Sequence, residues 1–413
     1  MATVRPFKAL RYSDVSEQVV APPYDVIGPE RRQQLMQSSA HNIVWLTLPE
    51  GDGDKYETAV QTLARWIDEG AVRDDDRPGF YRYVQTFRHP LTGQEVSRTG
   101  LIVTLKTEPY ERGVVLPHEQ TFPGVKEDRF RLLQATRTHL ESIFGLYESN
   151  SALQDSLGRA SFRPLAQLDH PDLPEGYSQR LEVADEPSDT EAIAGAFEPL
   201  RIWIADGHHR YETALRYGME SGDENSPTRF LPILLVSMDD PGLVILPTHR
   251  ALTSDPAPDW QSAIGERFDA RAVSLSGLLN EMERAADAAN PGIGFVNREQ
   301  AWLITPRGGL EMRSILGDGV SDALANLDVN VLHQALMPAM GFGDAAPEFT
   351  HDPRQALDGV ERGAYCSAFL LNPPSLAAMS EIANRGEKMP KKSTYFYPKA
   401  LSGLVMWRIP GGN

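Results

Sequence analysis

Apolar and polar positions follow two different periods along the chain, and the change between them is clearest near residue 206. The run 200-LRIWIA-205 is almost continuously apolar, as in a buried strand, and helical spacing follows through about Met219. Another apolar run at 231–237 predicts a second buried strand. The pattern therefore predicts strand, turn, helix and strand, with the helix starting near Gly207 or His208.

Similar patterns extend this organisation toward the N-terminus. A short strand within 18–21, a Pro-Pro turn and a helix opening near Gly28-Pro29 are expected there. Residues 148–190 carry scattered Pro, Asp and Ser and are interpreted as an excursion from the core. The other expected elements before the turn are a helix at 55–70, a hairpin at 80–87 and 98–105, a helix at 126–138 and a strand at 142–147.

The pattern changes after Thr248-His249-Arg250. An alanine-rich helical stretch at 277–289 is followed by expected strands at 293–296 and 301–305. We therefore expect an α/β (α+β) fold with a core at 1–255 and an appended C-terminal α/β portion at 256–413 that packs on the core.

Composition restricts the classes of partner. The chain has 413 residues and a net charge of −17, which argues against nucleic acid, because DNA binding depends on Lys and Arg. No apolar run reaches the length of a membrane span, and the single cysteine excludes an internal disulfide. A cytoplasmic location is expected, while the sequence does not indicate an oligomeric state.

The turn after the first buried strand, 206-DGHHR-210, has the composition of an anion site. Free backbone N–H groups at a helix start attract anions, and glycine allows close approach. His208, His209 and Arg210 would oppose the helix dipole there, at a cost of about 0.3–1 kcal/mol each. A bound phosphate would remove that conflict, and Arg210 offers it a two-pronged contact.

Other interpretations of this turn stay open. The side chain of Asp206 could cap the helix, or it could hold Mg²⁺ together with phosphate oxygens. The two histidines could bind a metal, although adjacent helical side chains point about 100° apart and chelate one ion poorly. A purely structural turn is the third interpretation.

Two further segments carry candidate residues. In 117-PHEQTFPGVKEDR-129 a solvated charged loop is the common outcome for such a composition, but a carboxylate facing a phosphate site could act as general base. In 388-KMPKKSTYFYPKALSGL-404 a solvated basic loop and a phosphate-closing loop are equally consistent with the sequence. The candidate contacts to substrate or phosphate in these segments are His118, Lys126, Arg129, Lys391, Lys392 and Ser393.

Five motifs in order resemble the domain-of-unknown-function family 1015. They are APPYDVI, LPHEQTFPGVKEDR, SIFGLY, ADGHHRYETAL and MPKKSTYFYPKALSGL. More distantly, 118-HE-119, 129-RFRLL-133, 142-SIFGLY-147 and 206-DGHHRYETA-214 resemble the ParB/sulfiredoxin-like nucleotide-binding fold. That fold includes ParB, a nucleotide-driven DNA clamp, and kinases of free serine.

This second resemblance implies roles for particular residues. Glu119 would be the catalytic base, and Asp206 would lie near the metal. The residues implied in nucleotide and phosphate binding are Gly207, His208, His209, Arg210 and Thr213. Glu119 and Asp206 would then face one pocket. The His-Glu to DGHHR gap is about twice the expected length, and no ParB-type helix-turn-helix is evident.

The expected function is nucleotide-dependent phosphotransfer to or from a small hydroxylated metabolite, with serine or phosphoserine as the leading candidate. ATP or ADP with Mg²⁺ would be the cofactor. The alternatives are a ParB-like nucleotide-gated regulatory or DNA-associated protein, and a phosphatase acting on phosphoserine.

Overall fold

In the computed structural model the polypeptide builds two folding units, and neither is continuous in sequence. Unit 1 comprises Met1–Pro117, Thr121–Val244 and Pro398–Asn413, and unit 2 comprises His118–Gln120 and Ile245–Tyr397. The expected boundary after residue 255 therefore falls inside unit 2. The structure describes residues 1–50, 53–119, 123–169, 177–220, 223–287, 291–308, 310–317, 319–343 and 345–411.

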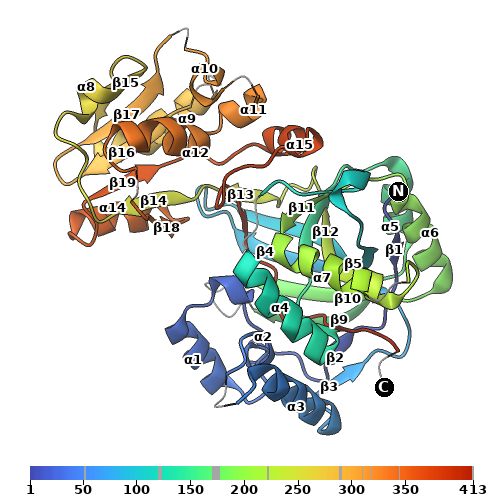
Figure 1. Ribbon diagram of the computed structural model, residues 1–413. Coiled ribbons are helices and arrows are strands. Elements are labelled where there is room, and N and C mark those ends of the chain that lie inside the picture. The colour runs from blue at the N-terminus through green and yellow to red at the C-terminus, as the bar shows by residue number, and fades with distance from the viewer. Residues whose placement is uncertain are drawn as a thin grey trace. The chain divides into compact units, whose positions relative to one another are not determined.

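A mixed sheet of nine strands forms the centre of the described part of unit 1 (Figure 1). Its strands run in the order β6 (Val115–Leu116), β11 (Ile202–Asp206), β8 (Ile143–Tyr147), β12 (Phe230–Ser237), β5 (Glu95–Lys106), β4 (Phe80–Arg88), β10 (Ser178–Ala184) and β9 (Arg163–Asp169), with β1 (Val4–Arg5) also paired to β5. Only the β11–β6 and β12–β8 pairs are parallel. The predicted β4–β5 hairpin is confirmed by its antiparallel register.

Three helices pack on one face of this sheet. They are α5 (Ser151–Arg159), α6 (Pro187–Phe197) and α7 (His208–Glu220). Leu153, Phe197 and Tyr211 share one buried cluster with alternate residues of β5, β8, β11 and β12. This burial explains why β12 is apolar at almost every position, because strands covered on both faces lose the alternating pattern.

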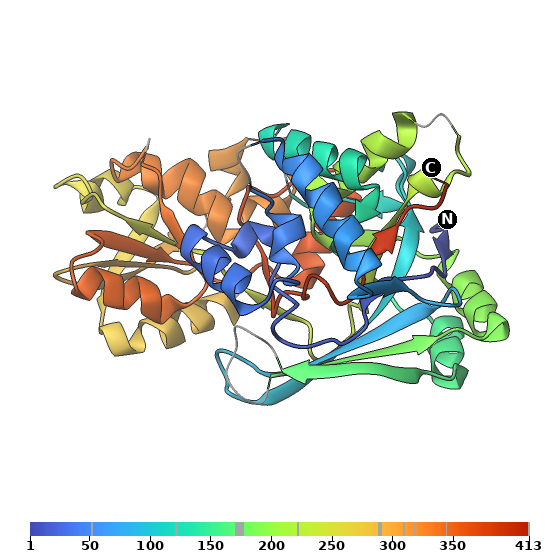
Figure 2. The ribbon, with the colours of Figure 1, turned by 90° about the horizontal axis from the view of Figure 1, so that it is seen from below.

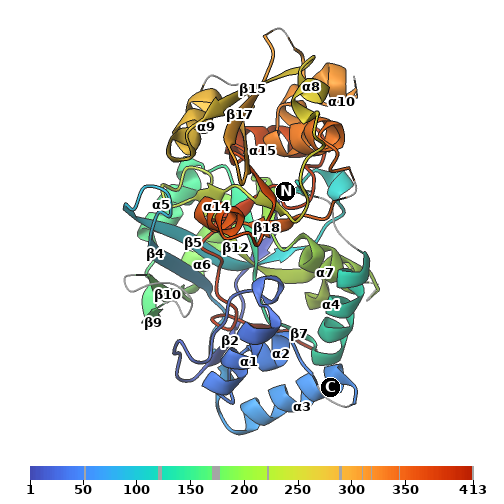
Figure 3. The same cartoon turned by 90° about the vertical axis from the view of Figure 1, so that its left-hand side faces the viewer.

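A second helical layer joins the N-terminal region to α7. The helix α4 (Pro123–Thr136) lies beside α7, and Arg216 of α7 stacks on the Phe130 ring of α4 at 3.7 Å (Figure 1). Lys55 of α3 (Lys55–Asp68) donates to Asp128 of α4 at 2.6 Å. The helices α1 (Pro29–Ser38), α2 (Val44–Thr47) and α3 lie together (Figure 3).

The structure corrects the expected strand within 18–21. Ala21 forms only an isolated bridge to Ser402. The carbonyls of Gln18 and Val20 accept hydrogen bonds from the Asn42 side chain at 2.7 and 3.0 Å. A side-chain amide therefore occupies the backbone acceptors that a strand partner would use. The helix opening at Pro29, with Gly28 as N-cap, is as predicted.

The interpretation of residues 148–190 as an excursion is also corrected. Their described part supplies α5 and two strands of the central sheet, β9 and β10, with β10 paired to β4 over seven residues. Figure 2 shows β9 and β10 in green beside the blue strands of the hairpin. The segment is thus an integral part of unit 1.

Unit 2 is built on an antiparallel sheet of six strands among its described residues. Their order is β15 (Phe268–Val273), β17 (Ala301–Pro306), β16 (Ile293–Asn297), β19 (Ser367–Leu370), β14 (His249–Leu252) and β18 (Glu348–Thr350). The helices α9 (Leu278–Asp287) and α14 (Pro353–Glu361) pack on it through Leu278, Met282 and Val360. The described chain contains no helix that is both long and apolar enough to cross a membrane.

Because Leu153 is fully buried in the sheet's core cluster, its truncation tests whether residues 148–169 belong to the core. We expect Leu153→Ala to lower the free energy of unfolding by about 2–5 kcal/mol, measured by chemical denaturation, since the change leaves a cavity. Leu91→Ala, at a 59% exposed position, is the control and should change little. Equal effects of the two variants would contradict the placement of α5.

Candidate functional site

The DGHHR turn joins a buried strand directly to a helix, as predicted. Strand β11 ends at Asp206, and helix α7 starts at His208. Gly207 lies between them with a φ of 90°. Residues 202–205 are buried, so the strand fixes the position of the turn, and the first N–H groups of α7 follow at once.

Gly207 is required here for two independent reasons. Its positive φ is strained for any residue with a side chain. A Cβ at this position would also lie 2.9 Å from Cβ and 2.7 Å from Cγ2 of Ile143. The chain can therefore turn so close to β8 only with glycine.

Asp206 carries a negative charge between two cations. Its Oδ2 lies 3.2 Å from Nζ of Lys399 and 3.7 Å from Nη2 of Arg210. Burial raises the pKa of this carboxyl, but the charges of Lys399 and Arg210 outweigh burial and lower the pKa to about 2. Asp206 is thus ionised at neutral pH and fixed in direction.

Arg210 is compensated by carboxylates rather than left exposed at the helix start. Its Nη1 donates to the Ser142 carbonyl at 3.0 Å and lies 3.6 Å from Oε2 of Glu141. Burial lowers the pKa of the guanidinium. The charges of Glu141 and Asp206 raise this pKa by more than burial lowers it, so the pKa lies above its usual value. The conflict with the helix dipole is therefore relieved within the protein.

Glu141 joins this cluster to two of the other motifs. Its Oε1 accepts from the Ser402 hydroxyl at 2.6 Å and from the Tyr24 backbone N–H at 3.2 Å. Tyr24 belongs to the APPYDVI motif, and Lys399 and Ser402 belong to the end of the last motif. Sequence reasoning missed Glu141 and Lys399, because the long-range ion pairs that identify them have no local signal.

Three predicted residues of the helices α4 and α7 make contacts that hold helices together. Lys126 donates to Glu212 of α7 at 2.7 Å, and its carbonyl accepts from the Thr213 hydroxyl at 3.4 Å. Arg129 donates to the Thr47 carbonyl at 2.6 Å and stacks on the Tyr24 ring at 4.3 Å. These contacts position α4 and α7, and no phosphate role follows from them.

The His-Glu pair lies in unit 2. His118 Nε2 is 3.0 Å from the Thr394 hydroxyl, and Oε1 of Glu119 accepts from the Lys392 backbone N–H at 2.9 Å. Lys392 has a φ of 58°, a strained value for lysine. The first half of the last motif is thereby attached to the His-Glu loop.

The remaining predicted residues lie on the same segment. The Ser393 hydroxyl donates to the Pro390 carbonyl at 2.5 Å, next to Lys391, and the Lys392 carbonyl accepts from Nη2 of Arg250 at 3.1 Å. Burial lowers the pKa of Arg250 to about 10, while the charge of Glu119 opposes this shift. Lys391, Lys392 and Ser393 therefore belong with Glu119.

The predicted residues thus form two groups. His208, His209 and Arg210 belong to unit 1 with Asp206, whereas Glu119 belongs to unit 2. That Glu119 and Asp206 face one pocket stays a prediction.

Two further features bear on ligands. A cavity of about 50 Å³ is lined by Arg129, Glu141, Arg210 and Thr213 among others, which suits a few water molecules and not a nucleotide. Among the described residues no group of three or more His, Cys, Asp or Glu side chains could hold a metal ion.

Comparison with protein families identifies the chain. The family model described as "Protein of unknown function (DUF1015)" matches residues 4–330. The chain belongs to the DUF1015 family. No curated protein matches this DUF1015 chain.

Solved structures with a similar course of the chain include a free serine kinase mutant in complex with ADP, at 15% identity and a TM-score of 0.38, covering 71% of this chain and 87% of the other. A conserved hypothetical protein from Pyrococcus furiosus has 15% identity and a TM-score of 0.35, and the match covers 71% of this chain and 90% of that protein. SbnI with C-terminal truncation from Staphylococcus aureus has 11% identity and a TM-score of 0.36, and the match covers 71% of this chain and 84% of that protein.

Because Arg210 lies between two carboxylates, its removal should destabilise the DUF1015 protein. We expect Arg210→Ala to lower the free energy of unfolding by about 3–5 kcal/mol, since it leaves buried Glu141 without its cation. Arg159→Ala is the control, because the side chain of Arg159 is 83% exposed and pairs with Asp155 of its own helix, α5. Denaturation curves with equal midpoint shifts would contradict a structural role of Arg210.

The low pKa of Asp206 makes a pH-dependent contribution to stability. The ionised form is stabilised by folding, so the contribution, of the order of 2 kcal/mol, is complete above about pH 4 and is lost as the pH falls toward 2. The difference in unfolding free energy between the wild type and Asp206→Asn should narrow over that range. This difference should narrow less with falling pH when both proteins also carry Lys399→Met. If it narrows equally in that background, Lys399 does not cause the pKa shift of Asp206.

Proposed function

We propose that this DUF1015 protein transfers a phosphate group between a nucleotide and a small hydroxylated metabolite, with serine or phosphoserine as the leading candidate. The observation that carries the proposal is an ionised carboxylate, Asp206, placed directly before a left-handed glycine and the start of the thirteen-residue helix α7. Such a turn offers backbone N–H groups to phosphate oxygens and a carboxylate to a divalent cation.

The residues of the turn would have different roles in binding phosphate. The first N–H groups of α7 would bind phosphate, with His208 and His209 in the first helical turn beside them. Arg210 is engaged with Glu141 and the Ser142 carbonyl, so we infer that it positions Asp206 and the turn. This role differs from the direct contact with phosphate that the sequence suggested.

Asp206 fits Mg²⁺ as a single carboxylate ligand. Mg²⁺ in nucleotide sites is commonly bound by one or two carboxylates with phosphate oxygens and water, so a cluster of protein ligands is not needed. When bound, the ion would offset charge on the transferring phosphate. Lys399 keeps the Asp206 carboxylate ionised and directed for this purpose.

From the motif resemblance we infer that Glu119 takes the proton of the acceptor hydroxyl. Its Oε1 accepts the backbone N–H of Lys392 at 2.9 Å, and this hydrogen bond orients the carboxylate. An oriented carboxylate can act as a general base, a step that contributes roughly 10²–10⁴-fold to the rate.

The experiment combines the protein with a metabolite mixture, Mg²⁺ and either ATP or ADP, and follows phosphate transfer by mass spectrometry. Glu119→Gln should bind nucleotide normally but lose about 10²–10⁴-fold in turnover, because glutamine cannot accept a proton. Asp206→Asn should weaken Mg²⁺-dependent nucleotide binding by about tenfold or more, as judged by calorimetry.

Glu127→Gln, on the exposed surface of α4, is the matched control and should behave like the wild type. Release of phosphate from phosphoserine without nucleotide would replace the proposal by a phosphatase. Full activity of Glu119→Gln would remove Glu119 from the mechanism.

A further inference from the structure

A second cavity of unit 1 has the size of a small-molecule site. Its volume is about 770 Å³, within the usual range of about 300–1,000 Å³. We call it the basic groove, and none of its lining residues belongs to the DGHHR turn. The charged residues of its walls are Arg5, Lys8, Asp74, Asp75, Arg137 and Arg408.

The charges of the basic groove are not balanced. Asp74 forms an ion pair with Arg408, and Asp75 is taken by Arg11, whose Nε donates to it at 2.9 Å. The other three cations of the wall, Arg5, Lys8 and Arg137, have no carboxylate partner among the described residues. Three uncompensated positive charges are unusual in a chain with a net charge of −17.

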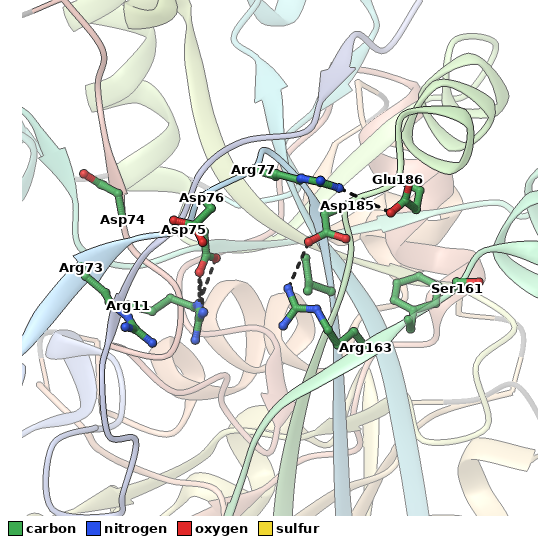
Figure 4. Close-up of a pocket in the computed structure, with 12 residues that line it drawn as sticks. Arg11, Arg73, Asp74, Asp75, Asp76, Arg77, Ser161, Arg163, Asp185 and Glu186 are labelled. Atoms are coloured by element: carbon green, nitrogen blue, oxygen red, sulfur yellow. Dashed lines mark hydrogen bonds and ion pairs between the residues drawn. The ribbon is translucent and has the colours of Figure 1, made fainter.

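An adjoining pocket of about 590 Å³ shows the usual arrangement. It shares Asp74 and Asp75 with the basic groove and also has several arginines. Figure 4 shows Arg11, Arg163 and Arg77 of that pocket each directed at a carboxylate, and the ion pairs are those with Asp75, Asp185 and Glu186. The lining of this pocket has five carboxylates for four arginines and thus no excess of positive charge, which distinguishes it from the basic groove.

Arg137 shows that the groove is strained as well as charged. It follows α4 with a φ of 49°, and its N–H donates to the Leu133 carbonyl at 2.8 Å, so that it occupies the left-handed cap position where glycine is usual. A side chain there is strained, because its Cβ comes too close to the following carbonyl oxygen. In addition, its Nε is buried and has no hydrogen-bond partner.

A cation at a helix C-terminus is favourable by itself, which is the simplest account of Arg137. That account explains the charge but neither the left-handed backbone nor the buried Nε, because any residue of the last turn could supply the charge. An anion in the groove would accept from the terminal nitrogens of the guanidinium and give a reason for arginine, in place of glycine, at this strained position. Arg5 lies on the same cavity with its guanidinium 4.2 Å above the Phe230 ring, which fixes its plane.

We propose that the basic groove binds a small anion with two or more negative charges, a phosphate monoester or a di- or tricarboxylate, through Arg137, Arg5 and Lys8. The proposal is independent of the proposed function, since the groove and the DGHHR turn share no residue.

The test titrates inorganic phosphate and citrate into the full-length protein at low ionic strength without magnesium, followed by calorimetry. Arg137→Gly should lose about tenfold or more in affinity for the preferred anion while its melting temperature stays equal or rises, because glycine relieves the positive φ. Lys8→Gln, at an exposed position, should weaken binding several-fold without affecting folding. The phosphate and citrate arms decide between the two ligand chemistries.

Arg131→Ala is the matched control, because it removes one exposed positive charge from α4 outside the groove and should leave binding unchanged. Asp206→Asn should also retain anion binding, which separates this proposal from the nucleotide site. The proposal is overturned if the wild type binds neither anion at millimolar concentration, if Arg137→Gly and Lys8→Gln both bind normally, or if Arg131→Ala loses as much affinity as Arg137→Gly.

Discussion

The arrangement of unit 1 around the DGHHR turn depends on four charges that balance within the protein. Arg210 and Lys399 are positive, and Glu141 and Asp206 are negative, with successive separations of 3.6, 3.7 and 3.2 Å. The four charges come from three segments of the chain, because Asp206 and Arg210 both belong to the DGHHR turn. Since breaking a buried pair exposes the remaining charge to a poorly solvated environment, the three segments are held as one arrangement.

This balance also changes the chemistry expected of the turn. A cationic helix start would attract phosphate by charge alone. Because Arg210 is already neutralised, the proposed function assigns the attraction of phosphate to the backbone N–H groups, and Asp206 would serve as a ligand of a bound cation.

The sequence predicted those parts of the site that have a local cause. The strand, Gly207 and the start of α7 follow from an apolar run that ends at a glycine. Lys399 and Glu141 could not be found in this way, because only the tertiary fold brings them to Arg210 and Asp206. Of the last motif the prediction chose Lys391 and Lys392, which belong to unit 2, since the density of charge there was the only signal available.

The missed elements of the fold have a similar explanation. Strand β9 is an edge strand with mostly exposed side chains, so its residues lack the apolar alternation by which strands are recognised. Residues 18–21 have the apolar pattern of a strand, but the Asn42 side chain donates hydrogen bonds to two of their carbonyls, so no strand forms there. Hydrogen bonds from a distant side chain leave no periodic signal. Helix α3 is amphipathic and was predicted correctly, because its burial follows directly from its spacing.

The return of Pro398–Asn413 to unit 1 has a consequence for folding during synthesis. A ribosome makes residues 1–244 well before it reaches Lys399 and Ser402, and roughly 5–20 residues are added each second. During the roughly 8–30 seconds in which residues 245–397 are synthesised, Asp206 lacks its lysine and Glu141 lacks its serine hydroxyl. Unit 1 is therefore the first to be translated yet the last to be completed. We expect chaperones to bind its incomplete nascent form more than any later stage.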